Sequence, residues 1–400
     1  MSILITVLFV MNSIIIAVAF SLVFFTEMYP AIYRKFRLAK YDTSYTPSIV
    51  LFLPCKGADD SFKQNIEATL TLKYPRHRIF YLVEDIHDPA YPIIKKTIAG
   101  KKHVKLVITG HAVKCGQKNH NLIKGIEAAG TKDEVFVFMD SDIEITERWL
   151  TDLVAPLSNP KVTLATGCMW LSLKYHTLGE RIHTFMIALQ RALIYFMPIG
   201  SVWGGCMAIR RTDFYRLGLK KIWANNISDD MGMMAKLNQE KAKAVLVPTC
   251  EGSARDPISS LTGSLNWITR QVLMIKYYLR PLWVFAMILI VYAVSQFFLL
   301  PFAIHKSIVS GAPEFEKIAV IILSTVFLLM CALTLMRRKV KDNHPLLVWF
   351  ILCPVYFLLT AFALLRSPFT SVVHWSNISY YMAFDGSVKK IVRPEPNRGR

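Results

Sequence analysis

The stretch Val135-Phe-Val-Phe-Met-Asp-Ser-Asp-Ile-Glu-Ile145 places two aspartates directly after five apolar residues in a row. The apolar run is typical of a buried sheet strand, so Asp140 and Asp142 stand at its carboxyl end. Ligands bind at that edge of open α/β sheets. Two carboxylates this close repel each other unless a cation lies between them. We therefore expect Asp140 and Asp142 to hold Mg²⁺ or Mn²⁺, which prefer oxygen ligands.

Apolar strand-like runs alternate with helical stretches on both sides of this segment. The expected strands are 48–54, 78–85, 104–109, 135–140 and 162–170, and the expected helices are 61–72, 92–100, 118–129, 149–157 and 178–197. Alternation at this spacing predicts an α/β fold, with a Rossmann-like, mostly parallel sheet flanked by helices. The helix at 178–197 fits either a buried position or a position on a membrane surface.

Three of the expected strands deliver polar residues at their carboxyl ends. These residues are Lys56 on the first strand, Glu84 with Asp85 on the second, and Asp140 with Asp142 on the fourth. A hydrophobic core alone does not require such an arrangement. The pattern therefore predicts a ligand crevice along one edge of the sheet.

Long apolar stretches at both ends of the chain predict membrane segments. Residues 3–25 are long enough to cross a bilayer, and we interpret them as a retained anchor rather than a cleaved signal peptide. The segment 33–40 that follows is basic, so the positive-inside rule predicts a cytoplasmic catalytic domain. Further spans are expected at 283–303, 318–336 and 346–365.

The basic segments 337–341 and 389–400 should both be cytoplasmic. A single membrane crossing between them, however, would place them on opposite sides. We favour a broken or re-entrant hairpin at Pro354 over a single crossing. The expected organisation is an N-terminal transmembrane anchor (1–27), a cytoplasmic catalytic domain (28–275), a C-terminal transmembrane region (276–370) and a basic tail (371–400).

The net charge of +19 suits an anionic membrane surface or a nucleotide diphosphate. The Lys and Arg residues are scattered and form no basic recognition helix, so we predict no nucleic-acid binding. The seven cysteines are widely separated, without a CxxC pair, which supports neither structural zinc nor a disulfide framework.

Two further polar motifs follow in the chain, Ser228-Asp229-Asp230 and Trp267-Ile-Thr-Arg270-Gln271. Asp230 is the candidate general base, because a carboxylate can take the proton of an acceptor hydroxyl in the transition state. The alternative is that this acidic triplet only caps a helix over 231–238. Arg270 is expected to clamp phosphate oxygens, or else to lie at the bilayer edge.

Other residues receive binding roles from their positions. Asp85 suits a uracil or ribose contact, or a helix cap, and Lys118 suits a diphosphate contact at a helix start, or plain solvation. The remaining candidates for the acceptor side are Trp203, Gly204, Gly205, Asp229, Trp267 and Gln271.

The chain resembles the family 2 membrane glycosyltransferases, especially the ceramide glucosyltransferase branch. Pro54-Cys-Lys-Gly is similar to that branch's first-strand signature, and Val83-Glu-Asp-Ile-His-Asp-Pro-Ala90 to its Asp-x-x-Asp-Pro-Ala segment. Gln117-Lys-Asn-His-Asn121 and the Trp375 region are also similar to motifs of such enzymes. The resemblance covers roughly 48–270 plus the membrane layout. It implies a GT-A fold and a nucleotide-sugar site that includes Pro54, Asp85, Lys118 and Asp140.

Two departures from the family pattern bear on function. The last family motif ends in Arg-Trp, whereas this chain has Arg270-Gln271, and the missing tryptophan counts against processive synthesis. The ceramide branch often has a single acid where this chain has Asp140-Ser-Asp142.

The expected function is therefore inverting transfer of a sugar from a UDP-sugar to a hydroxyl of a lipid in the bilayer, ceramide-like or another sphingolipid or polycyclic lipid. The rivals are a processive polysaccharide synthase and a non-enzymatic membrane transporter. The expected spans are nearly devoid of the polar residues that a transporter needs.

Overall fold

A mixed sheet forms the centre of the catalytic domain in the computed structural model, which describes residues 1–37, 40–171, 176–196, 202–254, 258–336 and 345–394. Its strands are β1 (Ile49–Pro54), β2 (His77–Val83), β3 (Val104–Ile108), β4 (Val135–Met139), β5 (Ile143–Glu144), β6 (Leu164–Leu171), β7 (Cys206–Arg210) and β8 (Ala244–Ala254). The strand order is β3-β2-β1-β4-β7-β6-β8-β5. β3, β2, β1 and β4 run parallel, and β7 is antiparallel to both of its neighbours. The expected mostly parallel α/β fold is confirmed.

Both faces of the sheet are covered by helices, which explains why its central strands are continuous apolar runs. Successive side chains of a strand point to opposite faces. Leu51 and Met139 accordingly belong to one core, while Phe52 and Phe138 belong to the other. The covering helices are α2 (Phe62–Leu70), α3 (Ala90–Thr97), α4 (Gln117–Ala129), α5 (Trp149–Val154), α7 (Arg211–Arg216), α8 (Leu219–Trp223) and α9 (Asp229–Gln239).

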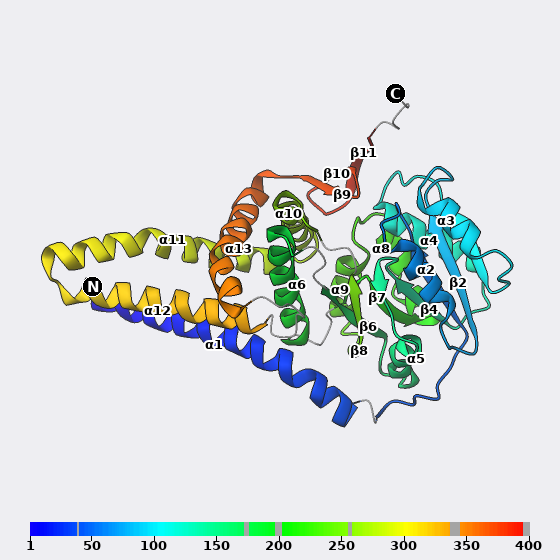
Figure 1. The fold of residues 1–400 in the computed structure, drawn as a ribbon, viewed down its shortest axis with the longest axis horizontal. Helices are drawn as coiled ribbons and strands as arrows, with labels where there is room; N and C mark the ends of the chain where they lie inside the picture. Colours follow the sequence, from blue (N-terminus) through cyan, green and yellow to red (C-terminus); the bar gives the residue numbers. More distant parts are fainter. Residues whose placement is uncertain (38–39, 172–175, 197–201, 255–257, 337–344, 395–400) are drawn as a thin grey trace.

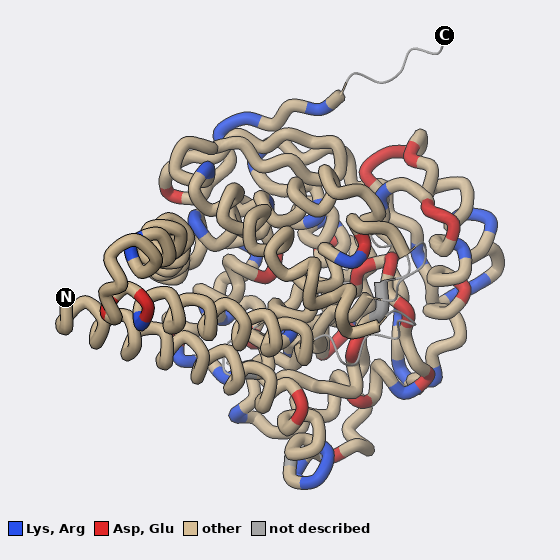
Figure 2. Tube along the Cα trace, turned by 60° about the vertical axis from the view of Figure 1, so that its left-hand side comes forward, with Lys and Arg blue, Asp and Glu red and all other residues tan. Residues whose placement is uncertain are grey.

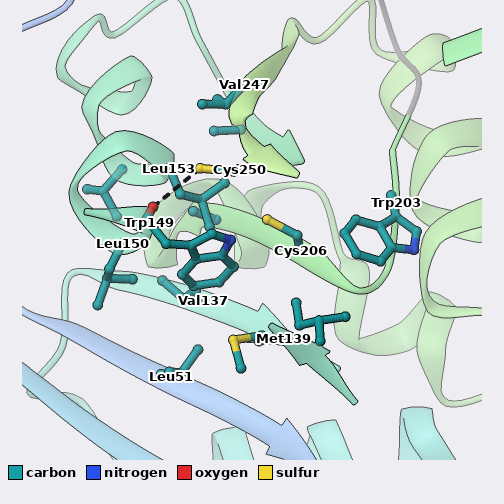
Figure 3. Packing of buried hydrophobic residues seen from close by; sticks show 14 of the residues in the cluster. Leu51, Val137, Met139, Trp149, Leu150, Leu153, Trp203, Cys206, Val247 and Cys250 are labelled. Carbon is teal, nitrogen blue, oxygen red and sulfur yellow. Dashed lines mark hydrogen bonds between the residues drawn. The ribbon is translucent and has the colours of Figure 1, made fainter. Parts of the chain in front are cut away.

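The core beneath β4 extends towards the end of the strand that carries the two aspartates. Trp149 of α5 is buried over Val137 and Met139, and its carbonyl accepts a hydrogen bond from Cys250 Sγ at 3.3 Å (Figure 3). The buried ring of Trp203 lies in the same cluster, beyond Cys206. Close packing of this kind fixes the position of the end of β4, and therefore the position of Asp140, which follows it.

Among the described residues, four helices are long and apolar enough to span a membrane: α1 (Ser2–Ile32, continued by a π-helical turn, Tyr33–Arg37), α11 (Arg280–Ser310), α12 (Pro313–Met336) and α13 (Leu346–Arg366). α1, α11 and α12 extend side by side away from the catalytic domain (Figure 1). Figure 2 shows almost no charged residues along these three helices. Asn12 exchanges amide hydrogen bonds with Gln296 at 2.9 and 3.1 Å, which joins α1 to α11.

The last apolar helix, α13, runs across the direction of the other three (Figure 1). It packs against α12 and α11, and also against α6 (Leu178–Phe196) and α10 (Leu261–Tyr278). Trp349 and Tyr356 are buried on its inner face, while Leu347, Ile351 and Leu358 are exposed. This pattern fits a helix with one face on the protein and the other on lipid.

Pro354 lies inside the continuous α13, so the expected break at this proline is wrong. A proline is tolerated inside a membrane helix where neighbouring groups satisfy the backbone carbonyl that it frees. The basic segment 337–341 lies outside the described residues, as does 395–400.

The C-terminal tail forms a three-stranded antiparallel sheet, which the sequence did not predict. Its strands are β9 (Val372–Trp375), β10 (Ile378–Met382) and β11 (Val388–Val392). Tyr380 Oη accepts a hydrogen bond from the Gln117 amide at the start of α4 (3.1 Å). Arg393 contacts Glu84 at 3.3 Å. The tail therefore lies against the catalytic domain.

This arrangement predicts that the α11–α12 connection and the tail lie on opposite sides of the membrane. Cysteines introduced as Ser310→Cys and Asp385→Cys should react with a membrane-impermeant maleimide from opposite sides of sealed vesicles. Asp42→Cys, in the catalytic domain, should match Asp385→Cys, and the unsubstituted chain gives the background labelling. Labelling of Ser310→Cys and Asp385→Cys from one side would contradict the arrangement.

Candidate active site

Two adjoining cavities lie at the carboxyl ends of β1 and β4. The first is lined by Pro54, Cys55, Lys56, Gly57, Asp59, Phe62, Gln117, Asn121, Ser141, Ser376, Ile378 and Tyr380. The second is lined by Met169, Leu171, His183, Gln190, Trp203, Gly204, Gly205, Ser228, Asp229, Asp230, Met231, Ile258, Trp267, Arg270, Gln271 and Met274. Lys118, Asp140, Asp142 and Trp375 line both. Almost all of the predicted site residues therefore meet in one crevice.

Lys118 lies at the centre of this crevice and is fully engaged by protein groups. Its ammonium is 2.7 Å from Asp140 Oδ1 and 2.9 Å from Asp229 Oδ2, and it donates to the Gly204 carbonyl at 3.3 Å. Burial works against the charge, but Asp140 and Asp229 together raise the pKa of Lys118 above its usual range. These two ion pairs and the contact to Gly204 place Lys118 between the acids, where its charge holds them together.

The start of α4 reaches these acids because Gly116 lets two backbones touch. A Cβ at Gly116 would lie 2.4 Å from the Ile227 carbonyl oxygen. The backbone carbonyl of Asn226 accepts two hydrogen bonds at 2.9 Å, one from the Gly116 amide and one from the Asn119 side chain. This contact brings the first turn of α4 beside the residues that precede α9.

Asp140 and Asp142 lie between β4 and β5, as the sequence predicted. Asp142 lines the cavity with its side chain exposed, so the like charge of Asp140, rather than burial, is the cause to which we assign its raised pKa. A divalent cation would relieve this repulsion, so the pair fits one. Within the described residues, no group of three or more His, Cys, Asp or Glu side chains forms a metal site. The remaining ligands would have to come from a bound diphosphate and water.

Ser228-Asp229-Asp230 both caps a helix and lines the second cavity. Ser228 Oγ accepts from the Met231 amide at 3.0 Å, the N-cap of α9. Asp230 Oδ1 accepts from Ser228 Oγ (2.5 Å) and from the Met231 amide (2.7 Å). Among the residues that the structure describes, Asp230 Oδ2 accepts only from the Gly204 amide, at 3.2 Å. An oxygen with one donor keeps a lone pair for a ligand.

Asp229 is buried behind Asp230, against Lys118. Burial, which outweighs the opposing charge of Lys118, raises the pKa of Asp229 to about 6. Gly204 and Gly205 pack here because nothing larger fits. A Cβ at Gly204 would lie 2.4 Å from the Asp229 carboxylate, and one at Gly205 would lie 2.3 Å from the Trp203 ring.

Arg270 lines the second cavity with its guanidinium over the ring of Trp375, 4.9 Å from the centroid. Burial lowers the pKa of Arg270 to about 10, while Asp230 and Asp140 act in the opposite direction. Within the described part of the chain, no carboxylate lies within the 4.0 Å of an ion pair with it. Its N–H donors are therefore available to an anionic ligand.

Asp85 is the predicted site residue that the structure does not bring to either cavity. Its carboxylate accepts from the His87 amide at 2.8 Å, a bond that lowers the pKa of Asp85, and His111 lies 3.6 Å away. The preceding Glu84 instead pairs with Lys56 and with Arg393. Asp85 does not cap a helix either, because α3 begins at Ala90 with Pro89 at its N-cap position, and the uracil or ribose contact assigned to Asp85 stays a prediction.

Several lining residues had no predicted site role, among them His183, Gln190, Trp375 and Tyr380. Trp375 carried a signal, because it belongs to the tail motif that resembles the family pattern. His183 and Gln190 lie seven positions apart on one helix, and nothing in the sequence linked that helix to the acidic motifs.

The sheet, its acidic edge and the cavities beside apolar helices define a glycosyltransferase of GT-A type. The chain belongs to glycosyl transferase family 21, whose model matches residues 11–388. Family 21 is the ceramide glucosyltransferase family, which is the branch that the sequence motifs resemble. The chain is a glycosyltransferase, and the hypothesis of a non-enzymatic transporter is wrong.

Several solved structures are similar in fold. One is a mannosyltransferase, PcManGT, from Pyrobaculum calidifontis in complex with GDP-Man and Mn²⁺ (16% identity, TM-score 0.48, 88% of this chain and 97% of that one). Another is glucosyl-3-phosphoglycerate synthase from Mycobacterium tuberculosis in complex with Mn²⁺, UDP and glucosyl-3-phosphoglycerate (14% identity, TM-score 0.38, 60% and 84%).

Replacing the central lysine should destabilise the domain. Lys118→Met leaves Asp140 and the buried Asp229 without their cation, and we expect a loss of about 3–5 kcal/mol in the free energy of unfolding. Urea unfolding of the solubilised protein measures it. Lys132→Met, an exposed lysine, is the control, and adding Asp229→Asn to Lys118→Met should recover part of the loss. Equal stability of Lys118→Met and the control would refute this role.

Removing the ring that stacks on Arg270 should impair glycosyl transfer. Trp375→Ala takes away a cation–π contact of about 1–2 kcal/mol, so we expect a roughly tenfold lower kcat/KM. Trp375→Phe should keep most of the activity. Tyr381→Ala, on the exposed side of the same small sheet, tests for damage to the tail. If Tyr381→Ala and Trp375→Ala lose equal activity, the stack has no specific role.

Proposed function

We propose that this protein is a membrane-bound, inverting glycosyltransferase that moves a hexose from a UDP-sugar to a hydroxyl of a lipid acceptor. The observation that supports this most directly is the meeting of two cavities at Lys118, Asp140, Asp142 and Trp375. One cavity suits a nucleotide diphosphate, the other suits an acceptor, and the acids lie where the two substrates would touch.

The first cavity has the features that we expect of the donor site. Pro54 and Gly57 end β1 at its wall, and Asp88 holds that turn by accepting from the Gly57 amide at 2.9 Å. Gln117 and Asn121 of α4 also line this cavity. The Gln117 amide is engaged by Gly110, Ala112, Asn121 and Arg393, so the Asn121 Nδ2 group is the one of the two that can recognise a polar ring.

Asp140 and Asp142 would hold Mg²⁺ or Mn²⁺ beside the donor diphosphate. When bound, the ion supplies Lewis-acid stabilisation of the leaving diphosphate. Arg270, with its free N–H donors, would bind the diphosphate oxygens from the second cavity, and the Trp375 ring keeps the guanidinium oriented.

Asp230 would act as the general base. The acceptor hydroxyl loses its proton to Asp230 Oδ2 while its oxygen forms a bond to the anomeric carbon. The bond from that carbon to the diphosphate oxygen breaks in the same displacement, and UDP leaves with the electron pair. A single displacement inverts the anomeric centre. The amides of Gly204 and Met231 fix the carboxylate in position.

A lipid acceptor fits the surroundings of the second cavity. Met169, Leu171, Ile258 and Met274 give it apolar walls, and α6 and α10 border it and pack against the membrane helix α13. A processive polysaccharide synthase is the remaining rival, and Gln271 in place of the family tryptophan speaks against it. Product chain length on the purified protein separates the two.

The catalytic domain would be cytoplasmic. Arg34, Lys35 and Arg37 follow the apolar part of α1 at the end nearest the catalytic domain. The positive-inside rule assigns such a cluster to the cytoplasmic face.

The test uses membranes that carry the full chain and a panel of labelled UDP-sugars. Sugar-labelled lipid should form with the wild type, and Asp230→Asn should lower the rate by about 10²–10⁴-fold, because the acceptor proton loses its base. Asp42→Asn, an exposed acid outside both cavities, should behave as the wild type. Equal labelling with Asp230→Asn would remove this residue from the mechanism, and a labelled polysaccharide would refute the lipid acceptor.

A further inference from the structure

The second cavity contains a hydrogen-bond donor that none of the described protein groups uses. His183 of α6 lines this cavity and is only 5% exposed. Its Nε2 has no hydrogen-bond partner in the described part of the chain. A buried polar atom without a partner costs free energy, so its retention in a ligand cavity points to a partner on the ligand.

The hydrogen bond at the other ring nitrogen sets the tautomer of His183. The Ile258 amide donates to Nδ1 at 3.3 Å, so Nδ1 carries no proton. Burial and the nearby Arg270 guanidinium lower the pKa of His183 to about 3, which keeps the imidazole neutral. A neutral ring with a bare Nδ1 carries its proton on Nε2. The unused atom is therefore a donor and needs an accepting oxygen.

The position of the ring is fixed by its neighbours. Trp267 packs edge-on against His183, with 5.1 Å between the ring centroids and 63° between the planes. Arg270 is the next side chain on the same face of α10 and is close enough to act on the charge of the imidazole. The free donor thus lies near the guanidinium that would hold the diphosphate, in the same cavity as Asp230.

Gln190 adds a second observation on the same helix. It follows His183 by two helical turns, on the same face of α6, and lines the same cavity. Its Oε1 is also buried without a partner in the described residues. Apolar Met169 and Leu171 lie on the same cavity wall. The cavity therefore offers two separated polar contacts within an apolar lining.

We propose that His183 Nε2–H binds an oxygen of the lipid head group next to the reacting hydroxyl, and that Gln190 contacts a second polar group of the same lipid. This inference rests on the proposed lipid acceptor and narrows the class of lipids that can serve as the acceptor. The preferred acceptor carries a hydrogen-bonding group, such as an amide or a second hydroxyl, beside the hydroxyl that receives the sugar. A lipid with a lone hydroxyl leaves the imidazole donor unsatisfied.

Equilibrium binding tests this without requiring turnover. A short-chain N-acyl sphingosine is titrated into the detergent-solubilised full-length protein, followed by tryptophan fluorescence, because Trp267 touches His183. His183→Leu should raise the dissociation constant about three- to tenfold, the effect of one neutral hydrogen bond. His183→Gln, whose amide can place an N–H near the Nε2 position, should restore most of the affinity. UDP affinity should be unchanged in both variants.

The probe lipid is compared with a long-chain primary alcohol, whose affinity should change less than twofold in His183→Leu. His103→Leu removes a histidine outside both cavities and should have no effect on either lipid. An unchanged affinity for the sphingosine lipid in His183→Leu, or equal weakening for both lipids, overturns the proposal.

The same preparation distinguishes this inference from the proposed function. If the wild type binds the N-acyl sphingosine with the His183 dependence but transfers no sugar to it from any UDP-sugar, the proposed acceptor reaction fails and the binding role stands. If sugar is transferred while His183→Leu binds and reacts as the wild type does, the reaction stands and the binding role fails.

Discussion

The ammonium group of Lys118 is the interaction on which the crevice depends. Asp140 follows β4 and Asp229 begins α9, so the chain brings carboxylates together from distant parts of the sequence. One buried cation between them, with a third contact to the Gly204 carbonyl, offsets part of their repulsion. The glycines at 116, 204 and 205 are needed because each lets a backbone or a ring approach where a Cβ would collide.

The formal charges of the crevice also bear on the donor. Four carboxylates, Asp140, Asp142, Asp229 and Asp230, face two cations, Lys118 and Arg270, within the described residues that line the second cavity. Four negative and two positive charges leave an excess of two negative charges, and an anionic diphosphate is repelled by such a site. A divalent cation that enters with the donor removes this excess, which is the electrostatic reason to expect one beside Asp142.

The sequence predicted the elements that local patterns determine. Continuous apolar runs identified β1, β2, β4 and β6, because strands buried on both faces have no polar alternation. Acids at the ends of elements led to Asp140, Asp142 and Asp230, and a guanidinium that suits phosphate led to Arg270. All four line the second cavity, and their roles stay predictions. The sequence could not say which of two adjacent acids turns inward. Glu84 and Asp85 follow the same strand, yet Glu84 pairs with Lys56, which lines the first cavity, while Asp85 accepts from the His87 amide, and neither acid itself lines a cavity.

Long-range pairings were beyond the reach of sequence patterns. Lys118 was expected to face a phosphate or solvent, since a helix start predicts an anion but does not predict two aspartates from other elements. The tail was expected to be a basic segment. It is instead a small sheet whose Tyr380 and Arg393 contact the start of α4 and the end of β2. Neither contact leaves a periodic signal in the sequence.

The location of the tail sheet follows from the chemistry that we propose. A base strong enough to activate a lipid hydroxyl also activates water, and hydrolysis would waste the donor sugar unless the crevice is closed. Trp375 lines both cavities and covers Arg270, so the small sheet is a wall at the place where the substrates would meet. α6 and α10 form a wall on the membrane side. Under this proposal the water-soluble donor and the lipid enter by separate routes, and the lipid hydroxyl meets the base where few water molecules can.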